Sequence, residues 1–92
     1  MRCNMKRFCK DVLNFLESEY DDSYRFEIEY KSTLNSKNDT VELIIIFNSN
    51  YKRKLTYDLM FFIFGWYCNG SFIEERNQYR WQKELVDIIE CS

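Results

Sequence analysis

The stretch LMFFIFGWYC, from Leu59 to Cys68, decides the fold: ten residues carry no charge in a chain in which 30% of residues are charged. A membrane-spanning helix needs about 20 apolar residues, so this segment is too short to cross a bilayer. As a strand it would be sticky and prone to aggregation. As a helix it begins at a capping Asp58 and ends at Asn69-Gly70. We predict a helix, because a sheet face needs a cover.

The two sides of this predicted helix are both apolar. The stripe expected to face the core contains Leu59, Phe62, Ile63 and Trp66, and the far side contains Met60, Phe61, Phe64 and Tyr67. So many apolar side chains are difficult to bury in one small domain. The patch around Phe61 and Phe64 could therefore form a homodimer as readily as a target interface.

An amphipathic helix is predicted upstream, over NMKRFCKDVLNFLESEY at 4–20. Asn4 can serve as its N-cap. Its apolar residues recur at helical spacing, and charged residues take the other side. The stripe consists of Met5, Phe8, Cys9, Val12, Phe15 and Leu16.

Three strands are predicted between these helices. YRFEIEYK (24–31) alternates strictly between aromatic or aliphatic and charged residues, which indicates one buried and one wet face. A polar loop follows at 32–39. TVELIIIFN (40–48) is apolar on most of both faces and suits a central strand. After a turn at 48–50, the lysine-rich YKRKLTY (51–57) suits a charged edge strand.

A last helix is predicted over 72–90, where Ser71 and Glu74 have the spacing of a capping box. Its core side would carry Tyr79, Gln82, Leu85, Val86 and Ile89, flanked by Trp81 and Ile88. The sequence thus predicts one domain, 1–92, of the α+β class. An N-terminal helix, a three-stranded antiparallel sheet and two C-terminal helices pack with the helices on one face.

The four cysteines, at positions 3, 9, 68 and 91, lack the close pairing of a zinc site, and the chain has no histidine. No secretory signal peptide is recognisable, so we expect reduced thiols in a cytoplasm, with Cys9 and Cys68 as buried apolar side chains. Abundant Phe, Tyr, Ile, Asn and Lys, without alanine or proline, indicate an AT-rich genome of bacterial, phage or viral origin.

Catalytic groups are scarce. The usual general base at neutral pH is histidine, which is absent, and two glycines cannot form a phosphate-binding loop. Glu27 and Glu29 share one strand face, roughly 7 Å apart, and Glu42 could lie across from them. Such carboxylates are more often a solvated sheet face than an acid/base or metal site. We predict no enzyme activity, metal or cofactor.

Charge is uneven although the net charge is only −2. An acidic stretch could mimic the phosphates of a nucleic acid and occupy the basic groove of a nucleic-acid enzyme. Its members are Glu17, Glu19, Asp21, Asp22, Glu27 and Glu29. Two basic sets, Lys52 to Lys54 with Tyr51 and Tyr57, and Arg76 with Arg80 and Lys83, could instead contact phosphates and bases. Direct nucleic-acid binding is disfavoured, because the chain is not basic.

The order of elements resembles that of small type II anti-CRISPR proteins of phages and prophages. The likeness lies in a helix, a three-stranded meander with an Asn-rich turn after TVELIIIFN, and a later NG before the last helix. It covers most of the chain and is architectural, without a diagnostic motif. The resemblance implies a protein that blocks a guide-RNA nuclease at its DNA-recognition surface. This chain departs from the strongly acidic character of such proteins.

The leading hypothesis is a phage or mobile-element inhibitor that binds a bacterial defence nuclease stoichiometrically in the host cytoplasm, without a membrane. The acidic stretch would face basic residues of the target, and Trp66, Tyr67 and Trp81 would be candidate anchors. The alternatives are a toxin-neutralising immunity protein or antitoxin, and a small nucleic-acid-binding regulator.

Overall fold

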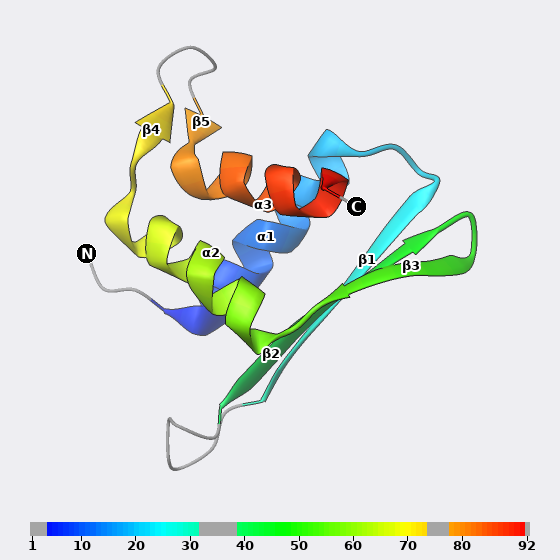
Figure 1. The fold of residues 1–92 in the computed structure, drawn as a ribbon, viewed down its shortest axis with the longest axis horizontal. Helices are drawn as coiled ribbons and strands as arrows, with labels where there is room; N and C mark the ends of the chain where they lie inside the picture. The colour runs from blue at the N-terminus through cyan, green and yellow to red at the C-terminus, as the bar shows by residue number, and fades with distance from the viewer. Residues whose placement is uncertain (1–3, 32–38, 74–77, 92) are drawn as a thin grey trace.

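A computed structural model describes residues 4–31, 39–73 and 78–91. It confirms the α+β architecture: an N-terminal helix, a three-stranded antiparallel sheet and two C-terminal helices, with a small two-stranded hairpin between the last two. The helices lie on one side of the sheet, whose other face is left uncovered by any described element (Figure 1). The molecule is therefore two layers thick.

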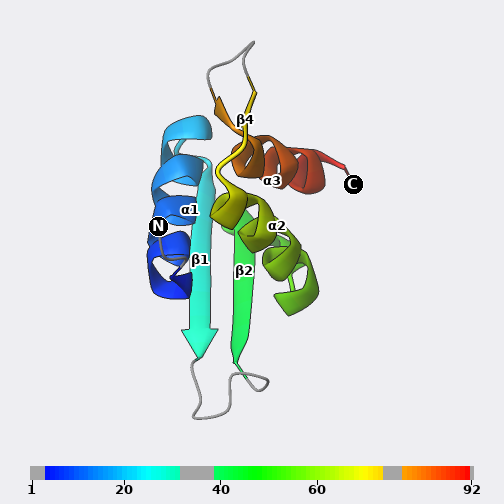
Figure 2. The same cartoon turned by 90° about the vertical axis from the view of Figure 1, so that its left-hand side faces the viewer.

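Helix α1 spans Met5–Glu19, and its side chains follow the predicted stripe. The Asn4 side chain caps it by accepting hydrogen bonds from the backbone N–H groups of Lys6 and Arg7, at 2.9 and 3.2 Å. Phe8, Cys9, Val12 and Leu16 are buried. The helix lies along the neighbouring strand β1, which spans Tyr24–Lys31 (Figure 2). The prediction for this end of the chain is confirmed.

Strands β2 (Thr40–Phe47) and β3 (Asn50–Leu55) complete the sheet in the order β1-β2-β3. The predicted turn is confirmed, since Asn48 and Ser49 take positive φ angles of 50° and 66°, which suit a two-residue hairpin. A bulge opposite Ile45 and Ile46 interrupts the alternation of β3. On the two sides of the bulge, Tyr51 pairs with Ile46 and Arg53 pairs with Ile45. Most of the loop predicted at 32–39 lies outside the described residues.

Helix α2 spans Tyr57–Asn69, so the predicted helix is confirmed, but its start and orientation differ from expectation. Thr56 is the N-cap, whereas Asp58 lies in the first turn without a capping hydrogen bond. Met60 and Ile63 are buried, while Phe62 is 51% exposed. Relative to the predicted stripe, the helix is rotated so that Met60 faces the core. A helix that is apolar all round has no polar side to fix its orientation. Gly70 ends it in the left-handed conformation, as predicted.

The start of the last helix was predicted wrongly. Phe72–Ile73 forms β4 and Gln78–Tyr79 forms β5, which pair as an antiparallel hairpin, and α3 spans only Arg80–Glu90. Ser71 does not start the helix, and its supposed box partner Glu74 lies outside the described residues. The rings of Phe72 and Tyr79 face each other across the hairpin with centroids 4.2 Å apart. Cross-strand aromatic packing therefore replaces the predicted first turns of helix.

One hydrophobic core joins all three helices to the inner face of the sheet. Its fully buried members come from all three helices and from β2 and β3, and Phe26 of β1, 8% exposed, packs with them. They are Phe8, Val12, Leu16, Val41, Leu43, Ile45, Leu55, Met60, Ile63 and Leu85. In α3, Trp81, Leu85 and Ile89 are buried, whereas Tyr79, predicted on that side, is 41% exposed.

The cysteines only partly follow expectation. Cys9 is a buried free thiol, as predicted, and Cys91 is an exposed free thiol. Cys68 is exposed and disulfide-bonded, so its assignment as a buried reduced side chain was wrong. The rotation of α2 turns Cys68 outward, away from the core. Within the described ranges, no helix combines the length and apolarity needed to cross a membrane.

Candidate functional site

The carboxylates on the outer face of the sheet are engaged by neighbouring cations. Glu27 forms an ion pair with Arg25 at 3.0 Å, and Glu29 with Lys31 at 3.3 Å. Glu42 lies directly across from Glu29 and pairs with Lys54 at 2.8 Å, where the shared hydrogen bond raises the pKa of that lysine. No group of three possible metal ligands occurs among the described residues. This face therefore has the arrangement of a solvated sheet surface.

Cys9 is poorly suited to nucleophilic chemistry. Burial raises the pKa of its thiol to about 11, which a hydrogen bond with the backbone offsets only in part. The thiolate, which is the reactive form, is then scarce at neutral pH. Cys9 thus contributes packing rather than reactivity.

The structure divides the predicted acidic stretch into two parts. Glu27 and Glu29 lie on the outer sheet face, paired as described above. The other four are exposed at the C-terminal end of α1 and in the turn to β1, and we call them the acidic end: Glu17, Glu19, Asp21 and Asp22. No described lysine or arginine forms an ion pair with any of them. The acidic end is therefore the unneutralised part of the stretch.

A further carboxylate reaches this region from the end of α3. The pKa of Tyr20 is raised to about 12, first by burial and then by the nearby charge of Glu90, with smaller contributions from Tyr24 and Glu19. The charge of Glu90 acts on Tyr20 although 70 positions separate the two residues in the chain. The sequence contained no signal for this proximity, because it results from the packing of α3.

A hollow of about 500 Å³ on the outer sheet face adjoins the acidic end. Asp22 belongs to both, and Arg25, Ile44, Ile46 and Tyr51 also line the hollow. Tyr51 is 66% exposed, more than any other large hydrophobic side chain in the described residues. Tyrosine is enriched in protein interfaces, and polar groups such as the neighbouring carboxylates are typical of an interface rim. Sequence reasoning had placed Tyr51 in a basic set, and the bulge in β3 changes its surroundings.

The predicted aromatic anchors lie elsewhere, between the helices. Trp81 is only 4% exposed and packs against Phe8 and Phe15, so little of its ring is accessible. Tyr67 is half-buried, and its hydroxyl donates a 2.7 Å hydrogen bond to Asp11 Oδ2. Trp66 is covered by the Arg80 guanidinium, 4.7 Å from its ring centroid. The structure does not bring these three residues together with the acidic end.

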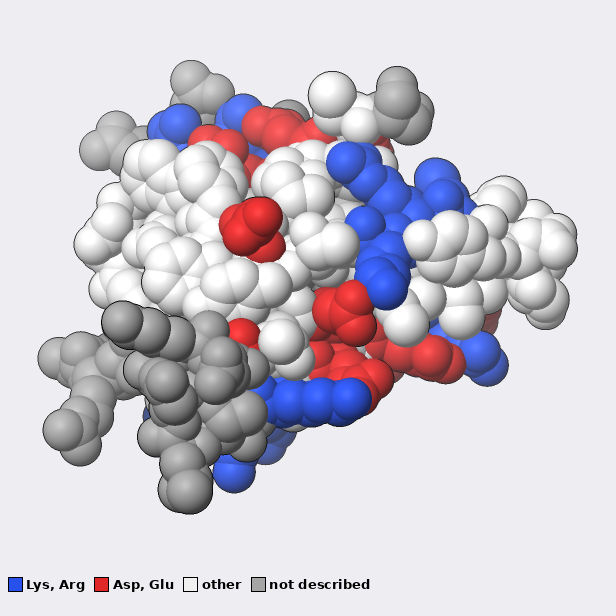
Figure 3. Space-filling model, turned by 60° about the horizontal axis from the view of Figure 1, so that its bottom comes forward, with Lys and Arg blue, Asp and Glu red and all other residues white. Residues whose placement is uncertain are grey.

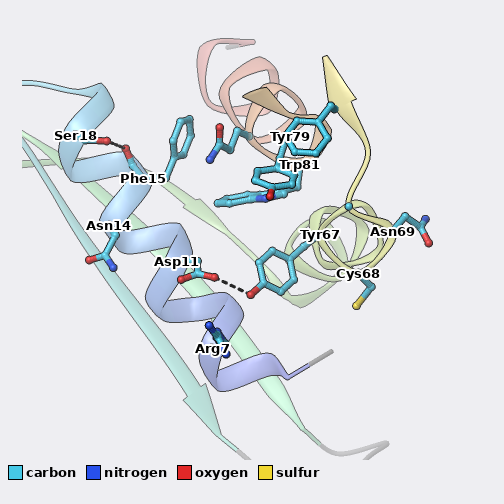
Figure 4. A pocket seen from close by; sticks show the side chains of 13 residues that line it. Arg7, Asp11, Asn14, Phe15, Ser18, Tyr67, Cys68, Asn69, Tyr79 and Trp81 are labelled. Carbon is cyan, nitrogen blue, oxygen red and sulfur yellow. Dashed lines mark hydrogen bonds between the residues drawn. The ribbon is translucent and has the colours of Figure 1, made fainter. Parts of the chain in front are cut away.

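Tyr67 and Trp81 do line a second, larger cavity of about 740 Å³ between α1, the end of α2 and the start of α3 (Figure 4). Arg7, Asp11 and Asn14 form its polar side along α1. Burial and the hydrogen bond to Asp11 raise the pKa of Tyr67 to about 12. The volume lies within the range of small-molecule pockets. The cavity could accept one apolar side chain of a partner or a small planar molecule.

The lysine-rich strand is occupied with internal contacts. The Lys52 ammonium donates to the Tyr24 hydroxyl at 3.1 Å, and Lys54 pairs with Glu42. The Arg53 guanidinium donates to the carbonyl oxygens of Ile88 and Cys91 at the end of α3. On α3, Arg80 and Lys83 pair with Glu84 and Asp87, and Arg76 lies outside the described residues. These contacts favour the structural interpretation of both basic sets.

Comparison with known proteins gives no further assignment: no protein-family model, curated protein or solved structure matches the chain.

Proposed function

We propose that the protein is a stoichiometric inhibitor, of the anti-CRISPR kind, which binds the basic nucleic-acid groove of a defence nuclease through its acidic end. The observation that carries the proposal is the position of four carboxylates, none of them in an ion pair with a described lysine or arginine, at the C-terminal end of α1 and in the turn that follows it. The last turn of α1 contains no basic residue. Backbone carbonyls already make that end negative, so the carboxylates add to an existing negative potential.

Folding stability does not account for this arrangement. An acidic side chain in the last turn of a helix opposes the helix dipole, whereas a lysine or arginine would favour it. Glu17 and Glu19 therefore work against the stability of α1. A basic partner would relieve the repulsion among these carboxylates and gain from their long-range attraction.

The hollow next to the acidic end supplies the apolar component that such an interface needs. Tyr51, with Ile44 and Ile46 beneath it, can contact the apolar rim of a groove while Asp22 and its neighbours meet cations. Glu27 and Glu29, which already have cationic neighbours, contribute less to the potential. The structure thus supports a smaller interface than the whole acidic stretch.

The test is DNA cleavage by a panel of type II guide-RNA nucleases, titrated with the purified protein. Inhibition should reach its end point at one inhibitor per nuclease and weaken as salt rises. The variant Glu19→Gln/Asp22→Asn should weaken inhibition on the order of tenfold at low salt. The matched variant Glu27→Gln/Glu29→Gln removes the same charge and should change inhibition far less.

Equal effects of the two variants, or inhibition that is insensitive to salt, would contradict the acidic end as the contact surface. If no nuclease in the panel is inhibited at a large excess of protein, the assignment to defence nucleases is wrong.

A further inference from the structure

The solvent side of α2 is a stripe with an apolar centre, polar residues at its two ends and the disulfide-bonded Cys68 near its C-terminal end. Its exposed residues recur at intervals of three and four and form one face of the helix: Asp58, Phe61, Phe62, Gly65, Cys68 and Asn69. Phe61 and Phe62 are 50% and 51% exposed, where a surface helix usually has charged side chains. Asp58 is the one charged residue in the helix. Figure 3 shows a broad surface without lysine or arginine, interrupted by an isolated acidic side chain.

Gly65 forms a notch in the middle of this stripe. A Cβ atom added there would meet nothing within 4 Å, so no contact inside the molecule requires glycine. Its backbone does not take a positive φ angle either, unlike that of Gly70. Glycine weakens a helix relative to alanine, so its presence calls for another reason. An exposed glycine between large side chains lets the surface of another molecule approach the helix closely.

The projecting Phe62 side chain and the notch at Gly65 lie in mutually complementary positions on the stripe. A two-fold axis between residues 63 and 64 places α2 of a second copy antiparallel to the first. In that register Phe62 of each copy faces Gly65 of the other. Asp58 faces Asn69, whose side-chain amide can donate a hydrogen bond to the carboxylate. These reciprocal pairs meet the requirement of a symmetric dimer interface, in which the same patch is used twice.

We propose that this stripe of α2 is a homodimer interface, in which the Phe62 ring of each copy fills the notch at Gly65 of the other. A second copy is the occupant favoured by the stripe itself, because it supplies both the projection and the notch. The Asp58–Asn69 pairs add polar complementarity at both ends. The interface is formed mainly by two short helices and is smaller than a standard one of about 800 Å² per partner, so the dimer should dissociate on dilution.

Sedimentation equilibrium of the full chain, over concentrations from about 5 to 500 µM, tests the proposal in the range of weak association. The average mass should rise from that of the monomer toward twice that value. Gly65→Leu fills the notch, and its Cβ meets no atom of the same molecule within 4 Å, so it should raise the dissociation constant at least about tenfold while leaving the melting temperature of the dilute monomer equal or higher. Phe62→Ser should weaken the dimer similarly.

Phe72→Ser is the matched control, since Phe72 is 56% exposed but belongs to β4 and not to the stripe. It should leave the dissociation constant unchanged, as should Glu19→Gln/Asp22→Asn at the acidic end. A monomeric mass at every concentration overturns the proposal and assigns this face to a different partner. A dimer that is unaffected by Gly65→Leu overturns it as well.

Discussion

The Tyr67 hydroxyl donates a 2.7 Å hydrogen bond to Asp11 Oδ2 and so joins the end of α2 to the middle of α1. The two residues are 56 positions apart in the chain, and the Tyr67 ring packs against Phe8 with centroids 5.1 Å apart. A polar contact and an aromatic contact thus hold the same helix pair. This pair also forms one wall of the larger cavity.

Removal of this hydrogen bond should destabilise the fold. Tyr67→Phe keeps the ring and deletes the hydroxyl, so it should lower the free energy of unfolding by about 1 kcal/mol at pH 7. The matched control is Tyr20→Phe, because the buried Tyr20 hydroxyl has no hydrogen-bond partner among the described residues. That change should be neutral or slightly stabilising. Urea unfolding of both variants measures the difference, and equal losses would contradict it.

Alkaline pH should weaken the fold through the same two tyrosines. Their folded-state pKa values are raised from 10 to about 12, mainly by burial, so the folded state binds the phenolic proton more tightly than the unfolded chain does. This contribution to stability is complete below pH 10 and is lost as the pH rises toward 12. Urea unfolding between pH 8 and 11 should show the decline, and Tyr20→Phe/Tyr67→Phe should flatten it. A urea midpoint of the wild-type protein that stays constant up to pH 11 would contradict this prediction.

The orientation of α2 predicts opposite responses at adjacent positions. Ile63 is fully buried, so Ile63→Ala should lower the free energy of unfolding by about 2–5 kcal/mol. Phe62 is 51% exposed, and Phe62→Ala in the dilute monomer should change it far less, although the side chain removed is larger. Chemical denaturation of the two variants at low micromolar concentration checks this order. A loss for Phe62→Ala as large as that for Ile63→Ala would instead favour the stripe expected from the sequence.

Arg53 should stabilise the end of α3. Its guanidinium donates to two carbonyl oxygens there, a favourable position for a cation at a helix C-terminus. Arg53→Met should lower the free energy of unfolding by about 1–2 kcal/mol and speed hydrogen exchange in the last turn of α3. Lys54→Met, on the same strand, removes only an exposed ion pair and should have a smaller effect. Unchanged exchange near Ile88 in Arg53→Met would show that the contact does not hold the helix.

Much of the fold follows from local sequence pattern. The alternation in YRFEIEYK and the helical spacing after Asn4 were sufficient for α1 and β1, because each pattern has one clearly polar side. The predicted start of the last helix was wrong, since a capping-box spacing like that at Ser71 also occurs by chance. There, pairing of Phe72 with Tyr79 prevails over local helix propensity.

The candidate site was predictable only in part. The sequence located the acidic residues, but it could not show that Glu27 and Glu29 form ion pairs while no described lysine or arginine pairs with Glu17, Glu19 or Asp22. Salt bridges depend on strand register and side-chain geometry. The approach of Glu90 to Tyr20 depends on helix packing over a long sequence separation.

By itself, the sequence determined the class of fold, the order of the main elements and the poverty of catalytic groups, because periodicity and composition are local properties of the chain. Only the tertiary structure decided which side of the uniformly apolar α2 is buried, which carboxylates stay unpaired and that Tyr51 stands beside them. Those features depend on contacts between distant segments, and no local pattern specifies such contacts.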